Sequence, residues 1–463
     1  MIRRLAAALR TAVAILAAFA ILAAPARAQE VLRDAETEAL LNAAAAPLIK
    51  AAGLDPGNVQ IFLINDPAIN AFVAGGQIVW IHTGLIAEAD NINQVQGVIA
   101  HELGHIEGGH VIRSSEGIKA ATGITLLSLV LGAAVMAAGG GEAGMGILAA
   151  GQQAAMGKYL AFSRTQESSA DLAGARYLHA AGISGKGTLE FFKKLQNLEY
   201  RLAPDLASDA VYGSTHPLSG DRLSTLTELY RADPAWNKPT DPALEARFKR
   251  VKAKLIGFVS DPPVTLRKYP ASDQTIPANY ARAYAYHKGA YPDQALANAD
   301  ALLKSIPDDP YFLELKGQIL LESGRPAEAI EPLRRAVAGT GGNPLIASML
   351  GHAIVATDDG RYLDEAEKVL RTSLSRDRDN PFGWYVLGNV YARKGDTARA
   401  ALASAEQANL SGNSAQALRQ AEMAMATLKP GTNDHLRAQD IAMVSRAAMD
   451  SKKNKKKKED TSR

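Results

Sequence analysis

The first hundred residues of the chain combine a helical and an extended hydrophobic pattern. Residues 33–54 carry apolar side chains three to four positions apart, which predicts an amphipathic helix. The run VQIFLIND (59–66) is rich in β-branched and aromatic residues, which predicts a strand. The segment 70–86 predicts a hairpin, with a short strand, a turn at Gly75-Gly76 and a second strand over QIVWIHTG.

Helical spacing returns over residues 92–111. The apolar face of this segment is formed by Val95, Val98, Ile99 and Leu103, and Gly108-Gly109 end it. Strands followed by a helix of this kind predict an α+β domain.

A long apolar stretch follows. Residues 121–138 (ATGITLLSLVLGAAVMAA) carry no charge and precede a Gly-rich run. At about 18 residues the stretch is just long enough to cross a hydrocarbon core. Three interpretations stay open: a buried helical hairpin of the domain (insert 116–160), a flap in peripheral contact with a membrane, or a true span. Its many small residues suit close helix packing and favour the hairpin.

The second half of the chain repeats itself. After a Pro-punctuated connector with one expected helix (244–258), Pro310, Pro344 and Pro381 recur at intervals of 34 and 37 residues, and Gly317, Gly351 and Gly388 keep the same steps. This register resembles the tetratricopeptide repeat (TPR), a pair of helices that stacks into a concave array able to bind partner segments. A further helical pair, 412–445, is expected to cap the array.

Both ends of the chain are compositionally distinct. The first 28 residues have Arg3 and Arg4, an apolar run and a small-x-small site ending at Ala28, which predicts a cleaved signal peptide; the rival interpretation is an uncleaved anchor. The tail KKNKKKKED (452–460) supplies six lysines, leaving the body near neutral and giving no argument for nucleic-acid binding. The tail is expected to be disordered and solvated, although it could touch acidic lipid. The chain has no cysteine, which excludes disulfides and thiolate metal sites and suits an oxidising compartment such as the periplasm.

The helix over 92–111 contains the sequence HELGH. His101 and His105 are four positions apart and share one helical face, so both can bind one Zn²⁺ ion. Zinc lowers the pKa of a bound water, and Glu102 is placed to take its proton.

A third protein ligand is required for such a site. The spacing H-E-x-x-H-x-x-G-x-x-H fails because Val111 stands at the last position, so we reject His110 as a ligand and expect it beside the site or at the surface. In AFSRTQESSADLAG (161–174), Glu167 and Asp171 share a helical face. Glu167 can bind the metal while Asp171 orients a ligand histidine.

HELGH followed by SRTQESSAD resembles the gluzincin peptidases that include the CAAX prenyl proteases and the HtpX-type proteases. With the signal peptide and TPR repeats, the chain is similar to the periplasmic BepA-type proteases. The resemblance implies a zincin-like α+β domain in which His101, His105 and Glu167 bind one zinc ion, Glu102 is the general base and Asp171 holds the free N–H of a ligand histidine. It also implies that STHPLSGDR (214–222) belongs to the site: His216 stabilises the oxyanion or covers the zinc, and Arg222 supports the site or the oxyanion.

The same resemblance assigns the strand within 70–86 to substrate pairing, while His82 fits no ligand spacing and is expected to be structural. We therefore expect a signal peptide (1–28), a metallopeptidase domain (29–233), a linker with one helix (234–276), a TPR domain (277–445) and a basic tail (446–463).

The expected function is zinc-dependent endoproteolysis in the periplasm of a Gram-negative bacterium, with the repeats binding misfolded outer-membrane proteins or their assembly machinery. The alternative is a latent protease that acts mainly as a TPR chaperone or adaptor. A third hypothesis is an inner-membrane protease anchored through 121–138.

Overall fold

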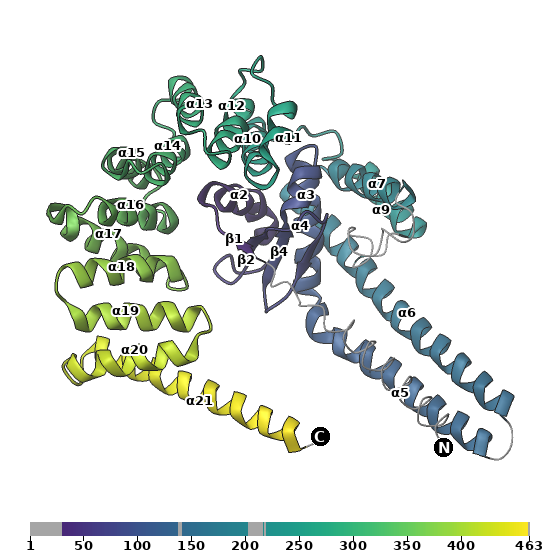
Figure 1. The fold of residues 1–463 in the computed structure, drawn as a ribbon. Helices are drawn as coiled ribbons and strands as arrows, with labels where there is room; N and C mark the ends of the chain where they lie inside the picture. Colours follow the sequence, from purple (N-terminus) through teal and green to yellow (C-terminus); the bar gives the residue numbers. More distant parts are fainter. Residues whose placement is uncertain (1–29, 138–140, 202–215, 217–218, 462–463) are drawn as a thin grey trace, which may run out of the picture.

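The computed structural model describes residues 30–137, 141–201, 216 and 219–461. The expected signal peptide and most of the segment before His216 lie outside these residues. The described chain comprises an α+β domain, a long helical hairpin that projects from it, and an array of paired helices (Figure 1).

The sheet of the α+β domain has four strands in the order β1-β2-β4-β3. Strand β2 (Gln60–Ile64) runs parallel to β4 (Ile78–His82), and β3 (Ala71–Val73) pairs antiparallel with β4 at one edge. The expected strand and hairpin are confirmed, with Gly75 and Gly76 at positive φ in the turn. Two details differ from the sequence prediction. The short strand β1 (Val31–Leu32) was not expected, and the segment after His82 forms a helix instead of continuing the strand.

Helices pack around this sheet. The predicted helices over 33–54 and 92–111 appear as α2 (Ala35–Ala51) and α4 (Ile92–Glu107). Both contribute to one core with the sheet, in which Leu48, Ile81 and Ile99 are fully buried. Helices α3 (Thr83–Glu88), α7 (Lys186–Arg201) and α9 (Gly220–Ala232) complete the domain.

The apolar stretch forms a helical hairpin of α5 (His110–Ala137) and α6 (Gly141–Ala181). Its arms pack through small residues: a Cβ at Gly151 would lie 2.1 Å from the Cβ of Ser128, and one at Gly132 would lie 2.9 Å from the carbonyl oxygen of Gly144. The hairpin is therefore confirmed, and of the three open interpretations the one that buries its apolar stretch in the domain is wrong. Only 11% of the most apolar window of α5 is buried, because the outer part of the hairpin extends away from the domain (Figure 1). The second half of α6 packs against the domain, with Ala173 and Tyr177 in its core.

The expected linker is more structured than predicted. Helix α10 (Pro242–Val259) matches the expected helix, yet Phe248, Val251 and Leu255 belong to the core of the α+β domain. A second short helix, α11 (Pro262–Lys268), follows it and was not expected. Its two prolines suggested a linker, but proline is tolerated in the first turn of a helix.

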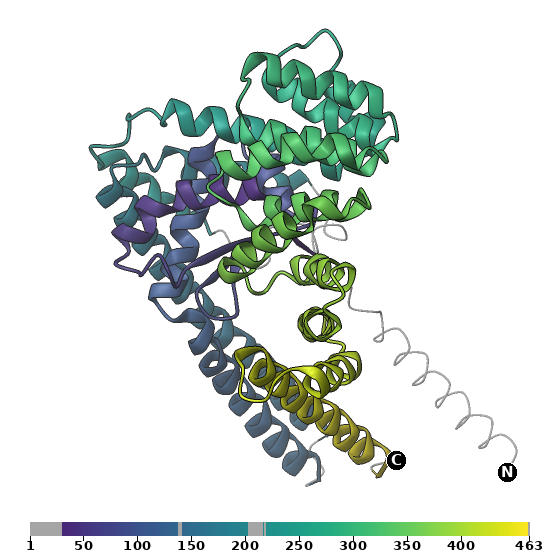
Figure 2. The same ribbon diagram turned by 90° about the vertical axis from the view of Figure 1, so that its left-hand side faces the viewer.

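Ten helices of the described chain stack as antiparallel pairs (Figure 2). The prolines of the predicted repeat, Pro310, Pro344 and Pro381, each occupy the first turn of a helix, where the missing N–H is not needed. The pairs are α12 (Ile276–Lys288) with α13 (Pro292–Ser305), α14 (Pro310–Glu322) with α15 (Pro326–Gly339), α16 (Pro344–Ala356) with α17 (Leu363–Arg376), α18 (Pro381–Arg393) with α19 (Thr397–Leu410), and α20 (Ser414–Thr427) with α21 (Asn433–Thr461).

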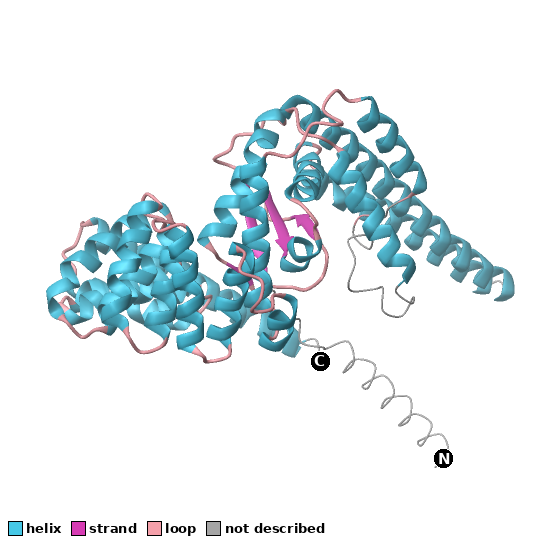
Figure 3. Ribbon diagram, turned by 90° about the horizontal axis from the view of Figure 1, so that it is seen from above, coloured by secondary structure: helices cyan, strands magenta, loops and turns pink. Residues whose placement is uncertain are grey.

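Two of the repeated glycines admit a large side chain from the paired helix. A Cβ at Gly317 would lie 2.4 Å from Leu333, and one at Gly351 would lie 2.9 Å from Leu370. The basic tail was expected to be disordered, but α21 continues through it to Thr461. Lysine is a good helix former, and nothing in the sequence of the tail ends the helix. Seen from above, the helical array lies on one side of the sheet and the hairpin projects on the other (Figure 3).

Candidate metal centre

The site lies where α4 crosses α6. Asn91 caps the start of α4, its side chain accepting a hydrogen bond from the N–H of Gln94. Two glycines allow the helices to approach: a Cβ at Gly104 would lie 2.6 Å from the carbonyl oxygen of Ala170, and one at Gly174 would lie 3.2 Å from the backbone of Ala100. This close crossing brings the histidines of α4 to the carboxylates of α6.

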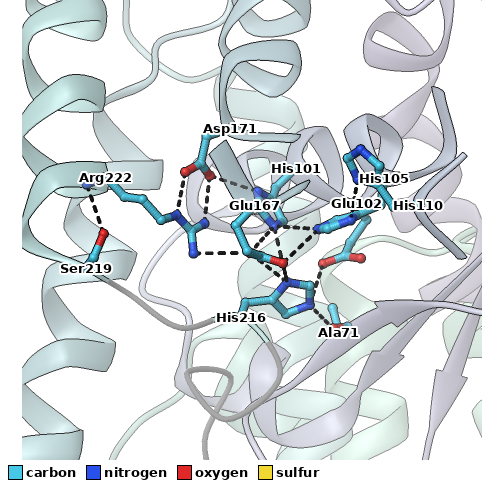
Figure 4. Close-up of polar contacts among 10 residues, drawn as sticks. All are labelled: Ala71, His101, Glu102, His105, His110, Glu167, Asp171, His216, Ser219 and Arg222. Carbon is cyan, nitrogen blue, oxygen red and sulfur yellow. Dashed lines mark hydrogen bonds and ion pairs between the residues drawn. The ribbon is translucent and has the colours of Figure 1, made fainter. Parts of the chain in front are cut away.

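Four side chains converge at the crossing (Figure 4). The Nε2 atoms of His101 and His105 are 3.1 Å apart, and each lies 3.4 Å from an oxygen of Glu167. The Nδ1 atom of His216 lies 3.3 Å from His101 Nε2 and 3.1 Å from Glu167 Oε1. All four groups are buried.

These separations fit a single metal ion. Two ligand atoms at zinc-bond length from a tetrahedral ion lie about 3.3 Å apart, close to each distance above. The donor set of imidazole nitrogens and a carboxylate is also one that zinc takes. The residues His101, His105 and Glu167 therefore form the group of a metal site, and His216 converges on the same point.

The outer nitrogens of the two α4 histidines are also engaged. His101 Nδ1 lies 2.9 Å from Asp171 Oδ1, so a proton on Nδ1 leaves the lone pair of Nε2 directed at the site. His105 Nδ1 lies 2.9 Å from His110 Nδ1. His110 is thus beside the site and is not in the converging group, in keeping with its expected place.

The path to His110 differs from the one that the sequence suggested. On a continuous helix His110 would point away. The chain instead leaves α4 at Gly108, and Gly109 adopts a φ of +61°, which turns the start of α5 back toward His105. The Gly-Gly pair was the available signal for this change of direction.

Arg222 joins α9 to the site. Its Nε and Nη2 atoms donate to the two oxygens of Asp171 at 2.6 and 2.9 Å, and Nη1 lies 3.1 Å from Glu167 Oε2. A bidentate pair of this kind fixes the plane of the carboxylate. The geometry favours the interpretation of Arg222 as a support of the site over that of an oxyanion donor.

The site is electrostatically prepared for a cation. Burial disfavours a charged His101, but the hydrogen bonds and charges of Asp171 and Glu167 outweigh it and raise the pKa of His101 to about 10. Burial and the neighbouring histidines lower the pKa of His105 to about 2, which keeps that ring neutral. Burial by itself would raise the pKa of Glu167, yet hydrogen bonds from His101 and His216 hold it well below its usual range. The carboxylates of Asp171 and Glu167 thus stabilise a positive charge at His101, and a divalent metal bound at Nε2 would displace the proton from that nitrogen.

Glu102 and the edge strand border the same space. Glu102 is completely buried, with Oε1 3.5 Å from His216 Nε2. That nitrogen also lies 3.3 Å from the carbonyl oxygen of Ala71 on β3, a contact that no motif in the sequence signalled. His82 is buried at the end of β4 outside the converging group, which agrees with a structural role.

The part of the chain that holds this site is similar to known peptidases. Residues 32–230 match the model of Peptidase family M48. The chain is 27% identical over 387 residues to the beta-barrel assembly-enhancing protease of Yersinia pestis, covering 82% of this chain and 77% of that protein. It is 30% identical over 181 residues to the metalloprotease LoiP of Escherichia coli, covering 38% and 64%. Among solved structures, the TPR protein YrrB matches 38% of this chain and 91% of its own length, with 18% identity and a TM-score of 0.32.

Proposed function

The chain belongs to peptidase family M48, and from this premise we propose that it is a zinc endopeptidase of the bacterial periplasm that is held latent by His216. The observation that carries the proposal is the converging group of His101, His105, Glu167 and His216, whose spacing matches four ligands around one ion. When bound, zinc would lower the pKa of a water molecule and polarise the scissile carbonyl.

Glu102 is the proposed general base. It follows the first ligand histidine on α4, and its Oε1 atom lies on the side of the site where His216 now stands. Once His216 has left, Oε1 takes a proton from the attacking water and then delivers it to the nitrogen of the leaving amine.

Strand β3 is the proposed track for the substrate. Asn70 accepts a hydrogen bond from the N–H of His82, and Ala74 donates to the carbonyl of Ile78. Since backbone groups alternate in direction along a strand, those of Ala71 and Val73 face the open edge. An extended peptide can pair with these groups, which orients its scissile bond toward the metal.

His216 blocks both requirements at once. Its Nδ1 atom stands where a fourth metal ligand would lie. Its Nε2 atom is hydrogen-bonded to the carbonyl oxygen of Ala71, which an extended peptide would use. Catalysis therefore requires His216 to move, which supports the covering role over the oxyanion role. Asp171 and Arg222 hold His101 and Glu167 in place.

The biological role that we propose is quality control of envelope proteins. The support comes from the signal-like start of the chain, from the name of the Yersinia pestis relative, and from the paired helices, which can bind polypeptide segments. The covered site favours a second candidate, in which the chain acts mainly as a chaperone or adaptor in outer-membrane protein assembly.

The test combines metal analysis with casein cleavage. Purified wild type should contain about one zinc ion per chain, and Glu102→Gln should keep the metal and lose cleavage, both alone and combined with His216→Ala. The matched control is Glu107→Gln on the same helix, because Glu107 bonds Tyr177 away from the metal ligands. Cleavage that survives in Glu102→Gln would overturn the mechanism.

The two biological roles are separated by complementation of a deletion strain. If Glu102→Gln restores the envelope barrier as well as wild type does, the chaperone role holds and proteolysis is dispensable. If it fails while Glu107→Gln succeeds, proteolysis is required.

A further inference from the structure

The outer half of the α5–α6 hairpin exposes an apolar surface that no other part of the described chain covers. Between Lys119 and Lys158 the sequence holds one charged residue, Glu142, which lies at the tip. The side chains that face outward are between 49 and 67% exposed, and they include Leu126, Leu127, Leu129, Val130, Leu131 and Met145. An exposed apolar surface of this extent indicates a binding surface.

The surface has a charged and aromatic boundary at its base. A Cβ at Gly117 would lie 2.5 Å from the ring of Phe162, so those two residues face each other across the hairpin. Lys119 is then level with Leu160, within one helical turn of Lys158 on the other arm. Tyr159 lies at the same level and is 41% exposed. Lysines and tyrosines in this position are typical of segments whose apolar part enters a bilayer while the base stays among the headgroups.

The two arms differ in polarity. Helix α5 has the length and composition of a membrane-crossing helix, while α6 carries the exposed pair Gln152-Gln153 midway along its apolar part. With Glu142 at the tip and lysines at the base, polar groups are present at both ends and on one side. This pattern suits a hairpin that lies in the interface with α5 more deeply buried than α6.

A second basic element reaches the same side of the molecule. The last turns of α21 carry the sequence KKNKKKK (452–458). In Figures 1 and 2, which are turned by 90° about the vertical axis, the end of α21 and the tip of the hairpin both reach the lower edge of the molecule. A lysine-rich helix end that reaches the same edge of the molecule as an apolar surface is complementary to a bilayer that contains anionic lipid.

We propose that the hairpin between residues 119 and 158, together with the lysine-rich end of α21, docks the protein on the surface of an anionic lipid bilayer. The apolar face of α5 enters the acyl region, Lys119, Lys158 and Tyr159 lie among the headgroups, and the end of α21 adds electrostatic attraction. This inference does not depend on the proposed peptidase mechanism.

One consequence concerns the metal site. Helix α6 is continuous from the hairpin to Glu167, which lies nine residues beyond Lys158, about 14 Å along the helix. Docking would therefore hold the site close to the bilayer, where polypeptides at the membrane surface can reach it.

The proposal is tested by flotation of the chain that begins at Gln29 with lipid vesicles. The vesicles consist of phosphatidylcholine with roughly 30% phosphatidylglycerol, which supplies the anionic lipid. Wild type should float, and the double variant Leu127→Glu/Val130→Glu should lose binding by about tenfold or more. The matched control is Val264→Glu, an equally apolar and 46% exposed position, which should bind as wild type does. Val264 belongs to α11, which is labelled in the upper part of Figure 1, away from the hairpin. Truncation after Asp450 should weaken binding to anionic vesicles and leave binding to pure phosphatidylcholine unchanged.

Insertion depth is measured on the same protein. The chain has no cysteine, so Leu127→Cys, Gln153→Cys and Val264→Cys can each carry one environment-sensitive fluorophore. On adding vesicles, the emission at position 127 should shift to the blue most strongly, that at 153 less, and that at 264 not at all.

Three outcomes would overturn the proposal. One is flotation that is unchanged in the Leu127→Glu/Val130→Glu variant, and another is the absence of a spectral shift at position 127. The third is a blue shift at position 127 without vesicles, accompanied by a dimer that forms as the protein concentration rises. This result would assign the surface to contact with a second copy of the chain.

Discussion

His216 makes two contacts that a substrate and a water molecule would otherwise need. One nitrogen stands among the metal ligands, and the other bonds the carbonyl of Ala71. A side chain that occupies both places competes with catalysis as well as with binding. Its removal should therefore increase activity rather than reduce it.

We expect His216→Ala to cleave casein faster than wild type, by about tenfold or more if the closed form predominates. Three protein ligands remain, so zinc should still be bound. The control is His179→Ala, since His179 pairs with Asp233 outside the converging group. Loss of turnover with unchanged KM would contradict the covering role and assign His216 to the oxyanion.

At this scale the sequence predicted most of the geometry. His101 and His105 are brought together by helical spacing. Glu167 lies beside both histidines, and Asp171 contacts the outer nitrogen of His101. Sequence spacing did not reveal the His105–His110 contact, because it depends on a positive φ at Gly109. The contact between His216 and Ala71 joins residues 145 positions apart, and no local pattern encodes it.

At the scale of elements, the open edge of β3 and the crossing of α4 with α6 define the site. The strand is only three residues long, and its outward-facing N–H and C=O groups lie on the side away from β4. A short edge strand limits unwanted pairing with other chains while leaving enough backbone to hold a peptide.

Replacing Val73 by proline tests this edge. Proline removes the N–H that faces outward and leaves the ladder to β4 intact, so we expect kcat/KM for a peptide substrate to fall by about tenfold. Val73→Ala keeps the N–H and should retain activity. Thermal unfolding of both variants shows whether the sheet is damaged. Equal losses of activity in Val73→Pro and Val73→Ala would refute the pairing of the substrate with β3.

Periodicity predicted the helices and strands well, and the exceptions have physical reasons. Strand β1 has two residues, too few to show a period. The hairpin was recognised, but an apolar helix has the same sequence pattern whether protein or lipid covers it. The tail was expected to be disordered from its charge, although lysine-rich segments also have high helix propensity.

At the scale of the whole molecule, a buried polar cluster joins the α+β domain to the helical array. Lys254 on α10 lies 2.5 Å from Asp34, and Tyr280 on α12 donates to Glu36 at 2.6 Å. Arg250 bridges Glu36 and Asp309. Because removing one member of such a cluster leaves a buried charge, the two parts are expected to hold a fixed orientation.

Glu314 is a buried carboxyl near this cluster whose ionised form is unfavourable. Burial raises its pKa to about 8, and the nearby Asp34 and Glu36 add to the effect of burial. A carboxyl whose pKa is raised in the folded state stabilises that state below its unfolded pKa near 4.5, and this stability is lost as pH rises toward 8.

We therefore expect Glu314→Gln to stabilise the protein on the order of a few kcal/mol above pH 8 and to have little effect near pH 4.5. Chemical denaturation at both pH values measures the change. Glu328→Gln serves as the control because Glu328 is exposed on α15. Equal effects of Glu314→Gln at the two pH values would refute the shifted pKa.

The short connection between His216 and Arg222 sets how the protein responds to its substrates. Arg222 is anchored by Asp171 and Glu167, so His216 is confined within six residues of a fixed point. A ligand on so short a tether has an effective concentration in the millimolar range, about what short linkers reach. A dilute free peptide would rarely displace it, whereas a polypeptide already bound to the helical array is itself tethered and competes on equal terms. Selectivity would then depend on retention by the array more than on the sequence that is cleaved.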